Sequence, residues 1–262
     1  MTILIFYHFG TYPNFKEYYL NCIQGQLRSY FPQAVSYNRF VELMPRVFYE
    51  LMLFMCIYSF GRCSCITFVD STMIPVCHNL RRHFNKVFVG LSKKERGTME
   101  WCHGFRLYFT CKDSRESITF CLTAANVDDR DDRVWSVFIK HLYGKVFIDR
   151  GYIKQELFEL LFDRGIHLVH GLKANMKNKF IPIWDKIMLR KRYVTECINE
   201  LLKNKANLVH SWHRPVHNFI MNLCSALDAY CFFENKQWNH CLYIRRIPYN
   251  FNFFNISYPK LT

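Results

Sequence analysis

The sequence predicts an α/β protein, in which helices flank a mixed five-stranded sheet and a short helical region precedes it. After residue 62, short β-like runs alternate with helical periods in the order strand, hairpin, helix, strand, helix, strand, helix. Residues 1–62 instead place their apolar side chains at helical spacing. A chain of 262 residues, half of them hydrophobic, is long enough to bury one core and a small helical annex.

The most apolar part of the first region, Val47 to Phe60, is predicted to be a buried helix. It is interrupted by Glu50 and stops at Gly61. This is well short of the ~20 apolar residues that a membrane-spanning helix needs. We therefore expect no membrane partner.

Five short runs predict strands, because they are rich in β-branched and aromatic residues and are bounded by turn residues. The second and third are joined by the turn 112–115 and form a hairpin. The segment from Arg81 to Arg96 is expected to be irregular, and its six Lys or Arg against the single acid Glu95 indicate contact with an anion or a solvated insertion. The predicted strands are Ile66–Asp70, Phe105–Cys111, Ser117–Leu122, Lys145–Asp149 and Ile166–His170.

Helices are predicted between these strands and after the last one. Asp128 and Asp129 are expected to act as caps, and the last helix is expected to pack back onto the sheet. The predicted domains are a helical region 1–62, an α/β domain 63–233 and an irregular tail 234–262. The predicted helices are Asp131–Leu142, Lys154–Arg164, a helix after Pro182, and Asn218–Phe233.

Charge and cysteine usage restrict the class of protein. Thirty-five Lys and Arg against 21 Asp and Glu give a net charge of +14, which indicates a polyanionic partner, nucleic acid first and an anionic membrane surface second. The 12 cysteines are scattered and no secretory leader opens the chain, so we expect reduced thiols and a cytoplasmic protein.

Two of the predicted strands end in an aspartate, Asp70 and Asp149. Open α/β sheets bind ligands beyond the carboxyl ends of their strands, so the two carboxylates are expected on one rim if the strands are neighbours. Carboxylates that converge in this way hold hard cations.

A third acid, Glu196, lies on a basic helical stretch. At ~100° per residue it shares one face with Arg192, Asn199 and Lys203, and the opposite face is apolar. The simpler interpretation is an ordinary i, i+4 salt bridge between Arg192 and Glu196, worth only ~0.3 to 0.5 kcal/mol.

These motifs together resemble bacterial insertion-sequence transposases of the DDE type. Residues 69–72, Val-Asp-Ser-Thr, are similar to the segment with the family's first catalytic aspartate, and residues 148–152, Ile-Asp-Arg-Gly-Tyr, to the segment with the second. Arg192, Glu196 and Lys203 reproduce the family's spacing of arginine, catalytic glutamate and lysine. The resemblance extends over roughly residues 35 to 233.

The resemblance implies a ribonuclease H-like catalytic domain that cleaves DNA at element ends and joins the ends to target DNA. It implies two Mg²⁺ or Mn²⁺ ions, with Asp70 bridging them and Asp149 and Glu196 each completing one coordination sphere. Arg192 and Lys203 would contact DNA phosphates. The partners would be double-stranded DNA and a second copy of the chain, in a bacterial cytoplasm at the nucleoid.

The alternative is a DNA-binding protein that no longer cuts. Related transposases usually have a longer helical region before the first aspartate, whereas Asp70 comes early here. Part of the region that recognises DNA ends is therefore expected to be missing, which would leave a transposase remnant that acts only through its basic surface.

Overall fold

The computed structural model describes residues 1–96, 101–152, 155–171, 180–208 and 215–233, and the predicted tail lies outside the described residues. The chain forms two compact units. One is helical and combines Met1–Ser59 with Glu200–Asn235, while the other contains Phe60–Asn199 and the whole sheet. The first boundary is close to the expected one at residue 62, but the helical unit also takes in a segment that was expected in the α/β domain.

The helical unit is built around α9 (Val216–Tyr230), whose residues from Asn218 to Tyr230 are all buried. It packs against α1 (Thr2–Tyr7) and α4 (Phe48–Phe54). A helix that is apolar on nearly every side needs neighbours on several sides, and these two helices supply two of them. The predicted packing of this helix onto the sheet stays a prediction. The other helices described in this unit are α2 Phe15–Glu17, η1 Tyr18–Gln26, α3 Tyr37–Leu43, η2 Met44–Val47, η3 Met55–Ser59 and η6 Leu201–Lys205.

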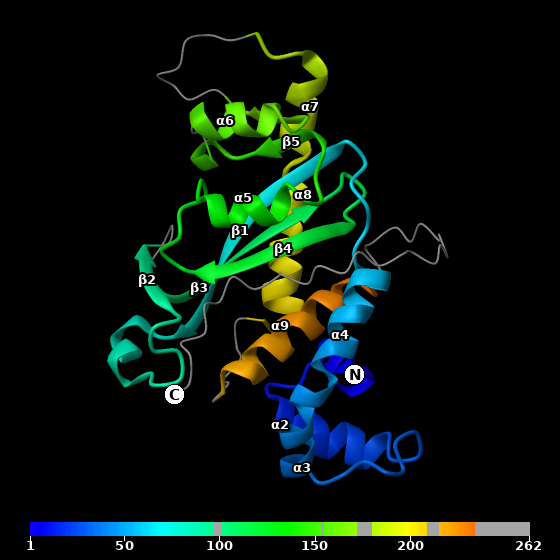
Figure 1. Cartoon of the computed structure of the whole chain (residues 1–262). Helices are drawn as coiled ribbons and strands as arrows, with labels where there is room; N and C mark the ends of the chain where they lie inside the picture. Colours follow the sequence, from blue (N-terminus) through cyan, green and yellow to red (C-terminus); the bar gives the residue numbers. More distant parts are fainter. Residues whose placement is uncertain (97–100, 153–154, 172–179, 209–214, 234–262) are drawn as a thin grey trace. The chain divides into compact units, whose positions relative to one another are not determined.

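The α/β unit contains a mixed sheet of six described strands in the order β2-β3-β1-β5-β6, with β4 also paired to β3 (Figure 1). β1 is antiparallel to β3 and parallel to β5, which is in turn parallel to β6. With helices flanking this sheet, the predicted ribonuclease H-like fold is confirmed. The strands are β1 Ile66–Cys77, β2 Lys93–Arg96, β3 Trp101–Cys111, β4 Ser117–Ala124, β5 Gly144–Ile148 and β6 Ile166–His170.

The expected number of five strands is one too few, because Lys93–Arg96 forms β2 at the edge of the sheet. A Lys-Lys-Glu-Arg run has neither β-branched residues nor an apolar alternation. Its strand structure comes from antiparallel pairing with β3, which is a tertiary contact. The charged residues suit an edge, where they discourage pairing with another chain.

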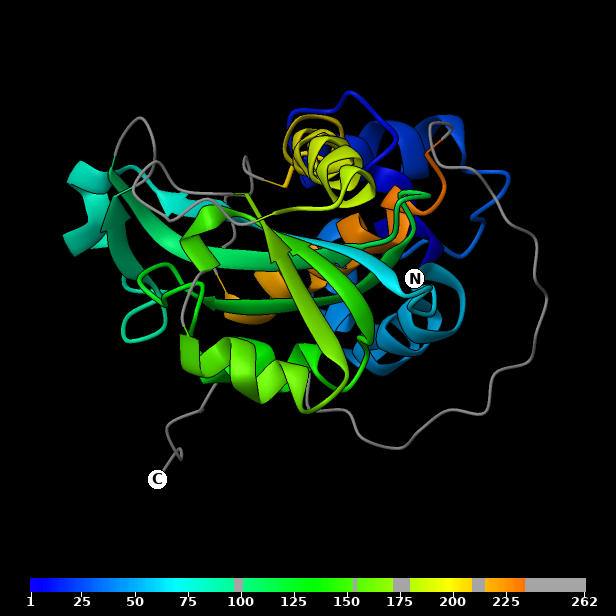
Figure 2. The same ribbon diagram turned by 90° about the horizontal axis from the view of Figure 1, so that it is seen from above.

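Helices cover both faces of the sheet. On one face, α5 (Asp132–Phe138) and α6 (Gln155–Phe162) enclose a core that includes Trp135, Val146 and Leu161. On the other lie α7 (Ile183–Lys191) and α8 (Tyr193–Glu200), and the Trp184 ring is 6.1 Å from that of Phe147. Figure 2 shows the sheet between these helices. The short helices of this unit are η4 Asn79–Phe84 and η5 Arg150–Tyr152.

No helix among the described residues combines the length and the apolar character needed to cross a bilayer.

Candidate active site

The pairing of β1 with β5 places Asp70 beside Asp149. The two strands are parallel and Phe68 is opposite Phe147, so the aspartates two residues further on are neighbours. Asp149 was predicted to be the last residue of its strand and instead directly follows the last residue of β5, Ile148. Asp70 is not the last residue of its strand, because β1 continues to Cys77 through its pairing with β3.

The third acid reaches the same place from α8, and the three carboxylates surround one guanidinium. Arg192 Nη1 lies 3.5 Å from Asp70 Oδ1. Arg192 Nη2 lies 3.9 Å from Asp149 Oδ1 and 3.6 Å from Glu196 Oε1. The expected i, i+4 pair of Arg192 and Glu196 thus exists, but as one part of a cluster of four charged groups, which we call the acidic triad and its arginine.

The cluster is enclosed at one end and open at the other. The side chains of Asp70 and Arg192 are 18% and 19% exposed, whereas those of Asp149 and Glu196 are 58% and 67% exposed. A ligand from solvent therefore meets Asp149 and Glu196 first and Asp70 at the bottom.

Two side chains of α8 hold the enclosed aspartate. Thr195 Oγ1 and Asn199 Nδ2 each donate to Asp70 Oδ2 at 3.1 Å. Burial raises the pKa of Asp70, while Arg192 and the donors from Ser71 and Thr195 oppose this rise. With Oδ2 held by these donors, Oδ1 faces the guanidinium.

Sequence reasoning placed Asn199 on the polar face without a role and missed Thr195 entirely. The available signal was their i, i+4 spacing, which puts both on one side of a helix. A buried threonine, only 1% exposed, carries no sequence signature of a contact with a strand 125 residues away.

The donor set suits a hard divalent cation, since it consists of carboxylate oxygens. Among the described residues, however, no three His, Cys, Asp or Glu side chains are grouped closely enough to hold a metal. Arg192 explains this spacing, because its guanidinium stands between the three carboxylates. The arrangement is a site for positive charge that an internal cation fills.

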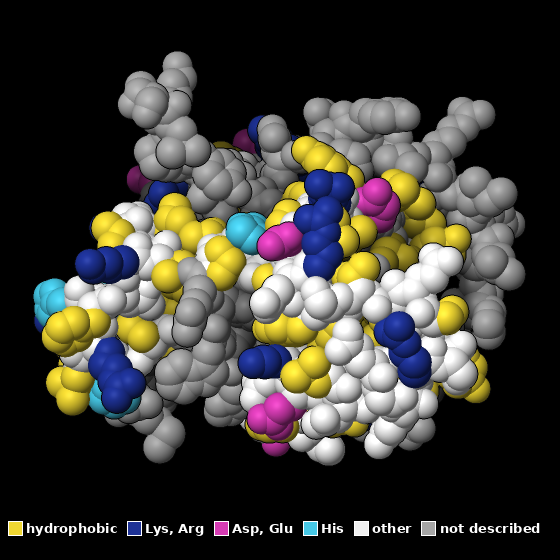
Figure 3. Space-filling view, turned by 90° about the horizontal axis from the view of Figure 1, so that it is seen from below, with side chains coloured by type: hydrophobic (Ala, Val, Ile, Leu, Met, Phe, Trp, Pro, Cys, Tyr) yellow, Lys and Arg dark blue, Asp and Glu magenta, His cyan; other side chains and the backbone are white. Residues whose placement is uncertain are grey.

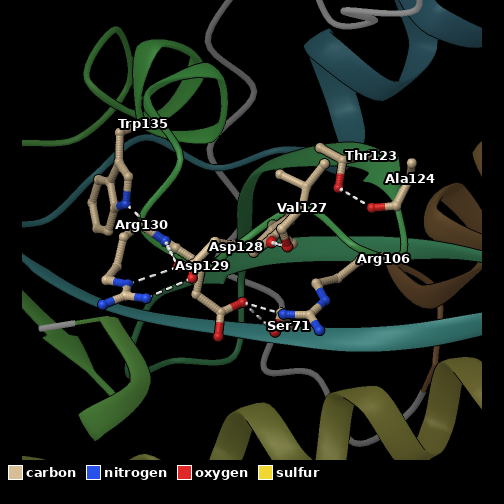
Figure 4. Close-up of polar contacts among 10 residues, drawn as sticks. Ser71, Arg106, Thr123, Ala124, Val127, Asp128, Asp129, Arg130 and Trp135 are labelled. Carbon is tan, nitrogen blue, oxygen red and sulfur yellow. Dashed lines mark hydrogen bonds and ion pairs between the residues drawn. The ribbon is translucent and has the colours of Figure 1, made fainter. Parts of the chain in front are cut away.

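A second polar cluster lies on the opposite face of β1, where the alternation of side chains directs Ser71. Asp129 accepts a hydrogen bond from Arg106 at 2.7 Å and one from Ser71 at 3.2 Å (Figure 4). The indole of Trp135 donates to the backbone oxygen of Asp129 at 3.1 Å. These contacts tie three separate segments to β1 next to Asp70.

The predicted capping role of Asp128 and Asp129 is therefore wrong. The N-cap of α5 is Asp131, whose carboxylate accepts from the backbone of Arg133 at 2.9 Å. Asp128 pairs with Arg130 at 2.6 Å. All three aspartates fit a cap by residue type, and only the position of the helix start selects one of them.

Four of the five predicted site residues thus lie together: Asp70, Asp149, Glu196 and Arg192. The fifth, Lys203, lies in η6, which belongs to the helical unit. Its predicted contact with DNA remains a prediction.

Comparison with known proteins identifies the family. A family model described as "Transposase DDE domain" matches residues 60–216, which is more than half of the chain. Among solved structures, the piggyBac transposase in a cryo-EM synaptic complex with hairpin DNA is similar, with a TM-score of 0.43 and 10% identity. The match covers 80% of this chain and 52% of that one, so this chain spans about half the length of that transposase.

No curated protein matches significantly. Because the family model covers more than half of its length, this chain belongs to the transposases with a DDE domain.

Proposed function

We propose that this protein is a bacterial insertion-sequence transposase that cleaves phosphodiester bonds at the element's ends and transfers the cut strand into target DNA. The observation that supports this most is the convergence of Asp70, Asp149 and Glu196 on one cationic group. Asp70 lies in β1, Asp149 directly follows β5 and Glu196 lies in α8, so the three residues come from parts of the chain that are far apart in the sequence. A solvated surface salt bridge does not require such an arrangement.

Carboxylate oxygens are the donors that Mg²⁺ and Mn²⁺ prefer, so Asp70, Asp149 and Glu196 would hold two such ions once Arg192 leaves the space between them. Bound there, the ions would supply activation of the attacking hydroxyl and stabilisation of the leaving oxygen. The chain's own part is to hold the carboxylates ready: Thr195 and Asn199 orient the Asp70 carboxylate, and the exposed Asp149 and Glu196 face the solvent from which DNA arrives.

Arg192 has a double role in this proposal. Without a divalent cation, its guanidinium neutralises the three carboxylates. With its carboxylate contacts given up, the guanidinium would pair with a DNA phosphate through two parallel N–H donors. This reconciles the phosphate contact expected from the sequence with the carboxylate contacts in the structure.

Double-stranded DNA is the proposed substrate, and the net charge of +14 supports a polyanionic partner. We further propose that two copies of the chain act together on paired DNA ends, since strand transfer requires both ends to be held at one target.

Metal-dependent nicking of supercoiled plasmid tests the proposal. The wild type should nick DNA with Mn²⁺ and not with EDTA, and Asp149→Ala should abolish nicking while DNA binding persists. Asp163→Ala is the matched control, because Asp163 is also exposed and lies outside the acidic triad. Equal nicking by wild type and Asp149→Ala would refute the catalytic assignment. Binding without nicking by all three proteins would favour the DNA-binding remnant.

Lys203 is tested separately through the salt dependence of binding. If it contacts a phosphate, Lys203→Ala should weaken DNA binding and reduce the slope of log K against log salt by ~1. An unchanged slope would remove Lys203 from the DNA-binding surface.

A further inference from the structure

The segment between β1 and β3 has no part in the acidic triad. We call Asn79–Arg96 the basic insertion; it consists of η4, a connecting segment and β2. It contains six Lys or Arg and one acid, Glu95.

The basic insertion is anchored to the sheet. Phe88 is 3% exposed and its ring lies 5.5 Å from that of Phe105 in β3. Ser92 Oγ lies 2.8 Å from Nε2 of His103, also in β3. Residues Lys93–Arg96 pair with β3 along their whole length. The insertion therefore presents its surface at a defined position on the α/β unit.

The outward surface of the insertion combines positive charge with exposed apolar side chains. Phe84 is 82% and Val89 74% exposed, and Trp101 at the start of β3 is 49% exposed. The Lys94 Nζ lies 4.0 Å from the centre of the Trp101 ring. Figure 3 shows basic, histidine and hydrophobic side chains close together over the region of η4 and β2, on the left. The exposed cations are Arg81, Lys86, Lys93, Lys94 and Arg96.

The positive charge of this surface is not balanced nearby. Within the described part of the chain, Lys93, Lys94 and Arg96 make no ion pair with a carboxylate. Burial lowers the pKa of His103, and the charges of Arg82, His83 and Lys93 lower it further. The insertion thus produces a positive potential that extends to its own anchor.

The insertion shares a face of the sheet with Asp70. Asp70 is opposite Phe109 in β3, and Trp101 lies eight residues earlier in the same strand, so both point to the face of Asp70. Arg96 is opposite Trp101 and Lys94 is opposite His103, which places these two cations on that face as well.

We propose that the basic insertion is a second contact surface for duplex DNA, which holds the backbone of the DNA whose scissile phosphate lies at Asp70. At ~3.3 Å per residue, the level of β2 along β3 is about 17 to 26 Å from Asp70. At ~3.4 Å per base pair, this corresponds to about five to eight base pairs from the cut. The inference rests on the proposed function and adds the place where the flanking duplex binds.

The test compares two charge-matched variants for binding to a 30-base-pair duplex in EDTA. The insertion variant, Lys94→Gln/Arg96→Gln, removes two cations from the insertion. The control variant, Lys140→Gln/Arg164→Gln, removes two exposed cations on the side of the sheet that carries α5 and α6. The insertion variant should reduce the slope of log K against log salt by ~1.8, at ~0.9 per phosphate contact, and the control should keep the wild-type slope. Thermal melting of both variants, compared with that of the wild type, checks that they are folded.

The position of the contact is tested by hydroxyl-radical footprinting on a linear fragment whose nick sites have been mapped with the wild type. Phosphates about five to eight base pairs from the nick should be protected by the wild type and the control, and exposed with the insertion variant. Equal slopes and equal footprints for the two variants would overturn the inference, as would a wild type that does not bind duplex DNA.

These outcomes are distinct from those of the nicking assay, because binding in EDTA requires no cleavage. A wild type that nicks through Asp149 while the insertion variant keeps its slope refutes only the insertion. A reduced slope without any nicking supports DNA binding by the insertion, and refutes the catalytic assignment together with the distance of that contact from a cut.

Discussion

The guanidinium of Arg192 lies 3.5 Å from the carboxylate of Asp70, in the space that the three acidic side chains surround. The side chains of Arg192 and Asp70 are both largely enclosed. Removing one of them leaves the charge of the other without compensation in an enclosed position. Because the other two carboxylates face the same guanidinium, the arginine balances the repulsion of the whole triad.

Arg192→Gln should destabilise the protein in EDTA by about 1 to 3 kcal/mol, because Asp70 loses its charged partner in an enclosed position. For a protein of this size that lowers Tm by ~2 to 4 °C per kcal/mol. Mn²⁺ should then raise the Tm of the variant more than that of the wild type, because the cation replaces the missing charge. Arg164→Gln serves as the exposed control, and a wild-type Tm for Arg192→Gln in EDTA would contradict the prediction.

Thr195→Val should move the acidic limb of the pH–rate profile for nicking to higher pH. The hydroxyl donates to the Asp70 carboxylate and lowers its pKa, so its removal lets burial raise that pKa further. Thr195→Ser retains the hydroxyl and should keep the wild-type profile. A uniform loss of rate in Thr195→Val at every pH would indicate a purely structural role.

Arg106 and Asp129 should be energetically coupled. Their side chains are 17% and 23% exposed and share a 2.7 Å hydrogen bond, so Arg106→Met or Asp129→Asn should each cost about 1 to 3 kcal/mol in urea unfolding. The double variant should lose less than the sum of the two, with a coupling of about 0.5 to 3 kcal/mol. The exposed pair of Arg39 and Glu42 is the reference cycle, and its coupling should not exceed ~0.5 kcal/mol. Additive losses for Arg106 and Asp129 would disprove the coupling.

Asp228 should make stability decrease with rising pH. This carboxyl is fully buried in α9, where the Ser59 hydroxyl donates to it at 2.6 Å, and burial raises its pKa to about 8. The folded state therefore binds the proton more tightly than the unfolded state. Its contribution is fully present below the ordinary pKa of 3.8 and is lost as the pH rises through about 8.

The measurement is the free energy of unfolding between pH 5 and pH 8.5, compared with that of Asp228→Asn, which mimics the protonated carboxyl and does not titrate. The wild type should lose stability relative to the variant by an amount on the order of 1 kcal/mol per pH unit across that window. Parallel curves for the two proteins would show that Asp228 does not titrate there.

Local pattern was sufficient for much of the fold and part of the site. The strand Ile166–His170 has the predicted bounds, and the hairpin of β3 and β4 lies where the alternation of side chains and the turn place it. Two aspartates at neighbouring strands were also predictable, because parallel strands of an α/β sheet align their carboxyl ends. Each of these features is encoded by residues close together in the chain.

Other features depend on contacts between distant residues. Whether β1 stops at Asp70 or continues to Cys77 is decided by pairing with β3, and the strand structure of Lys93–Arg96 by the same neighbour. The helix α9 joins the N-terminal helices because they enclose it on several sides.

By itself, the sequence determined the α/β class, the basic charge and the three acidic residues at motif spacing, because composition and short periodicities carry that information. Only the tertiary structure decided that Arg192 stands among these acids and that Thr195 and Asn199 hold Asp70. The positions of charges and donors across a gap of more than 100 residues follow from how strands and helices pack, and no local pattern records that packing.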